Sequence, residues 1–281
     1  MVTSSQPPAA STADAFDQSH QGRVRSAAVE RIYRSACGAD YPAPAQPSAF
    51  YSAATLQAVV DALELGPGRV VADLGCGHGG PGLWAVQQTG ATLIGIDLSP
   101  AGIDLARRRA AQLGLDRQAS FAAGDLTATG LPDASCDAVM SLDVLLFVPD
   151  KAAAVCEAAR ILRPGGRFAF TTWERLRHPA RDDPQRQALA DTFQAHPLLE
   201  FARADYRQLI ENAGFAVETY QEPPGWRDQQ RALAEGIVAA EAEVTADMGR
   251  HYLAMARVFL AGLPGLRYIF AVARHANARN L

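Results

Sequence analysis

The segment VVADLGCGHGGPGLWAV, residues 70–86, constrains the fold of this chain more than any other segment. An apolar run reaches Asp73, a glycine-rich turn follows, and an apolar helical pattern comes next. Glycine suits such a turn because it adopts positive φ angles and lets the backbone approach a bound group closely. The segment therefore predicts a buried strand, a ligand-binding turn and a helix, in that order.

The alternation of strand and helix continues beyond this segment. Strand patterns recur at TLIGID, ASFAAGD, CDAVMSL, RFAFTTW, FAVETYQE and LRYIFAVARH, and helical patterns separate most of them. Such alternation favours a doubly wound α/β fold, in which helices cover both faces of a mostly parallel sheet. The last strand has no helix of its own and is expected to pair antiparallel at the sheet edge.

The composition changes along the chain in a way that predicts five parts. Residues 1–24 read as a disordered polar tail and residues 25–65 as N-terminal helices. Residues 66–225 form the α/β core, and residues 226–265 are a helical insertion between strands six and seven. Residues 266–281 hold the last strand and a tail. We expect the N-terminal helices and the insertion to form a lid over the strand ends.

The charge and the cysteines exclude several classes of protein. The net charge is −4 and no stretch concentrates lysine and arginine, which disfavours a nucleic-acid partner. No apolar run is long enough to cross a membrane, and the N-terminus lacks the apolar region of a signal peptide. The four cysteines show no zinc-binding spacing, so we expect free thiols, no metal and a cytoplasmic location.

The glycine turn by itself leaves two ligands open. Gly75, Gly77 and Gly80 fit the G-x-G-x-x-G pattern of dinucleotide sites, and the same turn also fits a nucleoside site. The position of Asp73 separates them, because a carboxylate just before the turn repels a pyrophosphate and attracts an ammonium or sulfonium group.

Two further acidic residues follow the next strands. Asp97 ends TLIGID and is placed to accept both hydroxyls of a ribose, and Asp125 is placed to accept an amine of adenine. Because the carboxyl ends of neighbouring parallel strands meet at one edge, the three carboxylates predict a cradle for a cationic nucleoside.

Several segments together resemble the successive motifs of one family, the class I S-adenosylmethionine-dependent methyltransferases. These are VVADLGCGHGGPGLWA, LIGIDLS, GDL, LPDASCDAVMSLDVLLFVPD and LRPGGRFAFTTWE. The resemblance covers about residues 52–223. More narrowly, these segments resemble the small-molecule branch of the family, which is common in bacterial natural-product pathways. The resemblance implies a seven-stranded sheet whose last strand is antiparallel. It also implies S-adenosylmethionine as cofactor and a small-molecule acceptor methylated on oxygen, nitrogen or carbon.

The resemblance also assigns cofactor-binding residues by position. They are Asp73, Gly75, Cys76 and Gly77 for the methionine part, Asp97 for the ribose, Leu98 for the adenine ring, Asp125 and Leu126 for its amino edge, and Ser141 for the cofactor's amino group. These roles are expectations that the resemblance carries.

The sequence contains fewer recognisable signals for the acceptor site than for the cofactor site. Similar proteins often carry a histidine before the Pro-Asp that follows the fourth strand, whereas this chain has Leu146 and Phe147 in that neighbourhood. The candidates for catalysis are Asp143, His178 and Tyr33, and no residue is assigned as the base. We expect a monomer or a homodimer.

The sequence fits three other functions to different degrees. A protein that keeps the cofactor but performs another reaction, such as cyclisation, fits the apolar VLLFV segment and the missing histidine. A nicotinamide oxidoreductase is disfavoured by Asp73 and by the absence of a Y-x-x-x-K pair. A nucleic-acid methyltransferase is disfavoured by the charge and by the lack of its catalytic motifs after the fourth strand.

Overall fold

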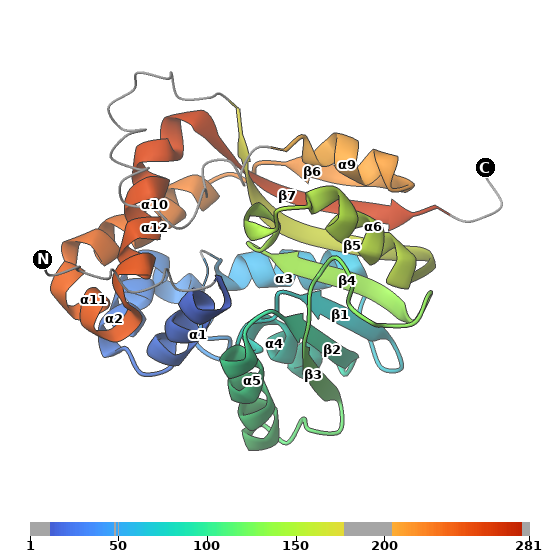
Figure 1. Ribbon diagram of the computed structural model, residues 1–281, viewed down its shortest axis with the longest axis horizontal. Coiled ribbons are helices and arrows are strands. Elements are labelled where there is room, and N and C mark those ends of the chain that lie inside the picture. Colours follow the sequence, from blue (N-terminus) through green and yellow to red (C-terminus); the bar gives the residue numbers. More distant parts are fainter. Residues whose placement is uncertain (1–11, 48, 50, 177–203, 277–281) are drawn as a thin grey trace, which may run out of the picture.

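A seven-stranded sheet organises the computed structural model, which describes residues 12–47, 49, 51–176 and 204–276 (Figure 1). The strand order is β3-β2-β1-β4-β5-β7-β6. The strands are β1 (Val70–Leu74), β2 (Thr92–Asp97), β3 (Ala119–Ala123), β4 (Cys136–Leu142), β5 (Leu162–Arg175), β6 (Phe215–Gln221) and β7 (Leu266–His275). Strands β1 to β5 pair in parallel, and β7 runs antiparallel to both of its neighbours. The predicted fold class is therefore confirmed.

The position of β7 differs from the prediction. This strand lies between β5 and β6 instead of at the edge of the sheet. Seven of its ten residues are buried, whereas only one of the seven residues of β6 is buried. A continuous apolar run such as YIFAVA needs neighbours on both sides and cover on both faces, so the more polar β6 takes the edge.

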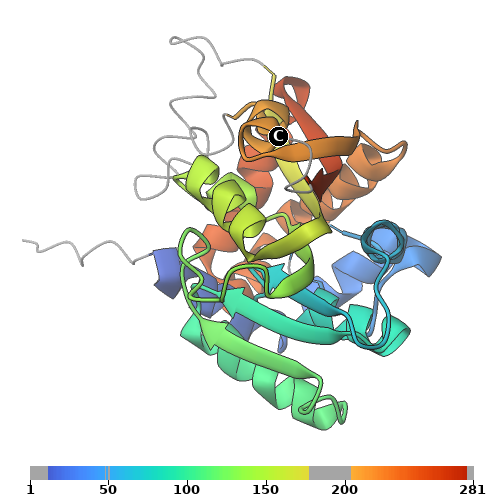
Figure 2. The ribbon, with the colours of Figure 1, turned by 90° about the vertical axis from the view of Figure 1, so that its right-hand side faces the viewer.

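Helices cover both faces of the sheet (Figure 2). One face packs against α3 (Ala53–Leu63), α4 (Gly80–Thr89) and α5 (Pro100–Gln112), and the other against α6 (Lys151–Ile161) and α9 (Tyr206–Asn212). Neighbouring strand residues alternate between the two cores: Val71 and Met140 face the first, and Ala72 and Val139 the second. The side chains of Ser52, Ser99, Asp150 and Asp205 cap α3, α5, α6 and α9.

We call the remaining α-helices together the helical cap. It consists of α1 (Thr12–Arg23), α2 (Ala27–Cys37), α10 (Trp226–Ala239), α11 (Glu241–Met248) and α12 (Arg250–Gly262). Segments from the two ends of the chain lie side by side here (Figure 1) and share one apolar core, in which Ile32 of α2 and Ile237 of α10 are buried. Short 3-10 helices occur at Gly38–Asp40, Leu145–Phe147 (η2) and Leu263–Gly265.

The predicted disordered tail is wrong over residues 12–23, which form α1. This helix has little apolar periodicity, and polar and close backbone contacts hold it instead. Asp17 accepts hydrogen bonds from the Ser99 hydroxyl and from the Ala101 N–H. At Gly22, an added Cβ would lie 2.3 Å from the Asp247 carbonyl oxygen, so α1 and α11 approach closely. Residues 1–11 and 177–203 lie outside the described residues.

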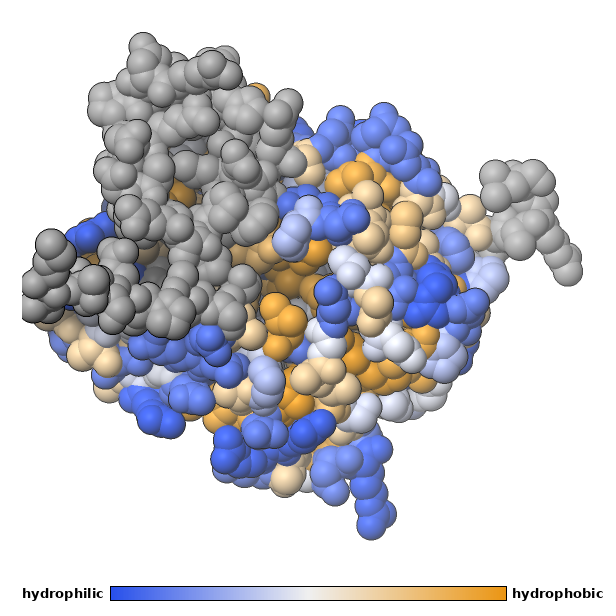
Figure 3. Space-filling model, in the orientation of Figure 1, coloured by the Kyte–Doolittle hydropathy of each residue, from blue (hydrophilic) through white to orange (hydrophobic). Residues whose placement is uncertain are grey.

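The surface drawn in Figure 3 is hydrophilic along its lower margin and apolar toward its middle. Among the described residues, no helix has both the length and the apolar character that a membrane crossing requires.

Candidate cofactor and active site

The glycine turn joins β1 to α4 in the conformation that its glycines permit. Gly75, Gly77 and Gly79 all have positive φ angles, of 84°, 51° and 79°. The N–H groups of Gly75 and Cys76 both donate to the Ile96 carbonyl, at 2.7 and 3.1 Å. These two hydrogen bonds fix the turn against the end of β2. Because the three glycines have positive φ angles, other residues at their positions would be strained.

Asp97 ties the same turn to the next helix. Its Oδ2 accepts from the Gly77 N–H at 2.7 Å and its Oδ1 accepts from the Ser99 N–H at 2.8 Å. The carboxylate is buried. Since each carboxylate oxygen can accept more than one hydrogen bond, both still have capacity for a ribose diol. The structure therefore brings two predicted cofactor residues, Asp97 and Gly77, into direct contact.

Asp73 is a buried acidic group at the end of β1, with only 2% of its surface exposed. Burial, and secondly the charge of Asp97, raise the pKa of Asp73 to about 7, and the Gly82 N–H offsets part of this shift. No well-formed hydrogen bond reaches its Oδ2 within the described residues. Buried carboxylates are normally paired with cations, so this site fits the ammonium or sulfonium of S-adenosylmethionine.

The other predicted cofactor residues divide between the rim and the core. Leu98 is 47% exposed, which suits a side chain that covers a flat ring. Asp125 is exposed, and its Oδ1 accepts from the N–H and hydroxyl of Thr127, both at 2.8 Å. Leu126 is buried in the core beside α6, and Ser141 is fully buried, with its hydroxyl donating to the Leu74 carbonyl. The Ser141 side chain thus binds β1 to β4.

The catalytic candidates lie in different surroundings. Asp143 follows β4 with an unusual positive φ of 58°, and its Oδ1 accepts from the Thr171 and Tyr268 hydroxyls at 2.9 and 3.0 Å. Tyr33 is buried in the helical cap, where its hydroxyl donates to the Ala49 carbonyl at 2.8 Å. His178 lies outside the described residues. Of the two candidates that the structure describes, Asp143 is the one placed at the carboxyl end of a central strand.

The loop of residues 44–46, to which no sequence motif assigns a role, lies directly on the glycine turn. The His78 Nε2–H donates to the Gln46 carbonyl at 2.9 Å, and Arg109 donates to the Pro44 carbonyl. An added Cβ at Gly80 would lie only 1.9 Å from the Ala45 carbonyl oxygen. Residues 44–46 therefore form one wall of the turn, and His78 anchors that wall.

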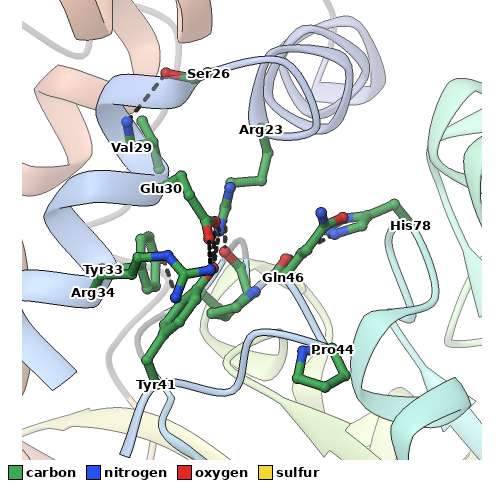
Figure 4. A network of polar contacts seen from close by, with 12 residues as sticks. Arg23, Ser26, Val29, Glu30, Tyr33, Arg34, Tyr41, Pro44, Gln46 and His78 are labelled. Atoms are coloured by element: carbon green, nitrogen blue, oxygen red, sulfur yellow. Dashed lines mark hydrogen bonds and ion pairs between the residues drawn. The ribbon is translucent and has the colours of Figure 1, made fainter. Parts of the chain in front are cut away.

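The same loop connects the turn to the helical cap (Figure 4). Arg23 of α1 is 2% exposed, donates to the Pro47 carbonyl at 2.6 Å, and pairs with Glu30 of α2 at 3.2 Å. Its guanidinium also lies 5.0 Å from the centre of the Tyr33 ring. Arg23, Asp17 and His20 all lie in the predicted tail, and no motif marks them as functional.

The fold and the site together define a class of protein. Parallel strands with a glycine turn after β1 and buried carboxylates at the ends of β1 and β2 are the arrangement of class I S-adenosylmethionine-dependent methyltransferases. No group of three or more histidine, cysteine or acidic side chains with metal-binding geometry occurs in the part of the chain that the structure describes.

Comparison with known proteins gives the same class. Residues 72–170 match the family model described as a methyltransferase domain. The chain is 36% identical over 108 residues to methyltransferase GfsG of Streptomyces halstedii, covering 38% of this chain and 39% of that protein. It is 28% identical over 225 residues to the 27-O-demethylrifamycin SV methyltransferase of Amycolatopsis mediterranei, covering 75% of this chain and 79% of that protein.

A solved structure extends the likeness to the whole fold. The [4+2]-cyclase SpnF superposes with a TM-score of 0.66 at 21% identity, covering 79% of this chain and 80% of that one. The matches to the first curated relatives span only 32% to 39% of those proteins' own length. Residues 72–170 therefore form a methyltransferase domain, and the chain is similar in sequence and fold to S-adenosylmethionine-dependent methyltransferases.

Proposed function

We propose that this protein transfers a methyl group from S-adenosylmethionine to an oxygen or nitrogen, or to a carbon, of a small molecule in bacterial secondary metabolism. The observation that carries the proposal is the buried carboxylate of Asp73, whose raised pKa reports a site in need of a cation. The likeness to the GfsG and rifamycin methyltransferases supports the substrate class.

The residues at the strand ends have separate tasks in this proposal. Asp73 and the turn Gly75–Cys76–Gly77 hold the methionine part, Asp97 holds the ribose, and Leu98, Asp125, Leu126 and Ser141 surround the adenine and the amino group. When bound, the cofactor supplies an electrophilic methyl group on a sulfonium. The protein's contribution is to align the acceptor with that methyl and to keep water away.

In this proposal the acceptor binds next to the carboxyl ends of β4 and β5. The segment Val144–Val148 follows β4 and contributes mostly apolar side chains, and Asp143 precedes it. In this proposal the acceptor is largely apolar, and Asp143 receives a proton from it or orients it. Its strained backbone, fixed by Thr171 and Tyr268, is typical of functional sites.

The helical cap completes the site as a lid. It brings α1 and the loop 44–47 against the glycine turn, and its apolar core includes Trp173 of β5 and Tyr268 of β7, which positions the cap over the ends of these strands. In this proposal the protein acts in the reducing cytoplasm, where cysteines such as the four free thiols of this chain stay reduced. We propose that it acts as a monomer or a homodimer.

A binding and a transfer experiment test the proposal. Calorimetry with S-adenosylmethionine, S-adenosylhomocysteine, NAD and NADP should show binding of the first two alone. Candidate acceptors are then incubated with the cofactor labelled in its methyl group, and label should appear in the product. Binding of NAD instead of the two adenosyl compounds would overturn the proposed function.

A second candidate function is catalysis of a cyclisation without methyl transfer. The observation that favours it is the shared fold of the cyclase SpnF. In that case the labelled methyl group stays on the cofactor while a substrate is still converted, which separates the two candidates in the same incubation.

A further inference from the structure

His20 of α1 is a buried polar side chain that lies on the glycine turn. An added Cβ at Gly77 would be 2.5 Å from its Cε1, and one at Gly102 would be 3.0 Å from its Cδ2. The imidazole is therefore in contact with both glycines, one in the turn and one at the start of α5. A Cβ at Gly77 would overlap the ring, and one at Gly102 would make a tight contact with it.

The imidazole has unused hydrogen-bonding capacity. Only 7% of His20 is exposed, and its Nδ1 has no hydrogen-bond partner among the described residues. Buried polar atoms rarely lack a partner in a folded protein, so an unpaired ring nitrogen at a ligand site points to a ligand. Burial lowers the pKa of His20, against the opposing charges of Asp97 and Asp17, which favours the neutral ring.

The rest of α1 holds His20 in this position. On one side Asp17 accepts from the Ser99 hydroxyl and from the Ala101 N–H, which fixes α1 to the N-terminus of α5. On the other side the Phe16 ring meets the edge of Phe147 in η2, with centroids 5.4 Å apart. The helix thus spans the strand ends from β2 to β4 and presents His20 between them.

We infer that His20 is a cofactor-binding residue, which forms the ribose end of the S-adenosylmethionine site with Gly77 and Asp97 and makes a hydrogen bond through Nδ1 to a ribose hydroxyl. This inference rests on the proposed function, because it takes the cofactor as given. It goes further by adding a residue of the N-terminal helix to the site.

Calorimetric titration of the full-length protein tests the inference without any need for turnover. S-adenosylhomocysteine and its 2′-deoxy and 3′-deoxy analogues are titrated into the wild type, His20→Ala and His20→Asn. We expect His20→Ala to bind S-adenosylhomocysteine about tenfold more weakly. One of the deoxy analogues should bind the wild type and His20→Ala equally, because the hydroxyl that His20 contacts is missing. His20→Asn keeps a polar group near the position of Nδ1 and should recover most of the affinity.

Phe16→Ala is the matched control for the docking of α1. It loosens the helix without removing a hydrogen-bonding group, so it should weaken all three ligands by one common factor. Equal binding of S-adenosylhomocysteine by His20→Ala and the wild type would overturn the inference and leave the proposed function intact. Tighter binding by His20→Ala would also overturn it, because His20 would then obstruct the site. If the wild type does not bind S-adenosylhomocysteine, both the inference and the proposed function fail.

Discussion

Asp73 and Asp97 are buried at the ends of two neighbouring parallel strands, and the charge of Asp97 adds to burial in raising the pKa of Asp73 to about 7. Two like charges in a region shielded from water destabilise each other. Such an arrangement weakens the protein alone and strengthens the binding of a cation. In the proposed function, Asp73 therefore links the stability of the protein, the pH and the affinity for the cofactor.

The stability of the cofactor-free protein should fall as the pH rises from about 4 to about 7 through the contribution of Asp73. In that range the folded state keeps the proton that the unfolded chain has already lost. Asp73→Asn should therefore raise the free energy of unfolding by up to about 4 kcal/mol at pH 8, and should have little effect at pH 4. Urea denaturation at several pH values measures this. Asp116→Asn, which makes the same change at an exposed position, is the control and should change the free energy of unfolding by less than about 0.5 kcal/mol.

The affinity for S-adenosylhomocysteine should have the opposite pH dependence. The ligand's ammonium group binds best when Asp73 is ionised, so the dissociation constant should rise about tenfold for each pH unit below about 7. Calorimetry between pH 5.5 and 8.5 gives this profile. A profile that is equally steep in Asp73→Asn would assign the effect to another group.

Replacing Asp97 and replacing Asp125 should have different effects on cofactor affinity and on stability. Asp97→Ala deletes two hydrogen bonds from buried backbone N–H groups as well as the proposed ribose contact. It should weaken cofactor binding by about 100-fold or more and destabilise the protein by about 2–4 kcal/mol. Asp125→Ala removes an exposed side chain that bonds only within its own turn, so we expect a loss of about three- to tenfold in affinity with little change in stability. Thermal unfolding beside calorimetry separates the two effects, and equal losses of stability would contradict this view of the turn.

Gly75 should be less replaceable than Gly68, although both have φ angles near 80°. An added Cβ at Gly75 would lie 2.3 Å from Cγ2 of Val144, whereas nothing lies within 4 Å of one at Gly68. Gly68→Ala should cost about 1–2 kcal/mol for the backbone alone, and Gly75→Ala about 1–3 kcal/mol more for overlap. Denaturant unfolding measures both variants. The second change Val144→Ala should relieve part of the cost at Gly75 and none at Gly68, and additive effects at Gly75 would show that overlap is not the cause.

Arg23 should contribute more to stability than Arg34, although both pair with Glu30. Arg23 is buried and also donates to the Pro47 carbonyl, whereas the Arg34 side chain is 59% exposed. Arg23→Ala leaves buried partners unpaired and should destabilise the protein by about 2–4 kcal/mol, and Arg34→Ala by less than about 1 kcal/mol. Urea denaturation compares them. Equal costs would indicate that the Pro47 contact does not hold the loop.

The sequence by itself determined the class of the sheet and the positions, at the ends of its strands, of most residues that we propose to bind the cofactor. The signals are local: alternating strand and helix patterns, a glycine turn that only positive φ angles can make, and acidic residues placed at the ends of strands. Asp73, Gly77 and Asp97 are brought together because parallel strands end at one edge. Their roles in binding stay predictions until a ligand is measured.

The tertiary structure decided what local patterns do not contain. The place of β7 inside the sheet depends on how its two buried faces compete with β6 for neighbours, and this is a property of the whole sheet. The order of α1 depends on contacts between residues far apart in the sequence, such as Asp17 with Ser99 and Gly22 with Asp247. A short polar helix has no signal of its own, since its stability comes from its partners and not from its propensity.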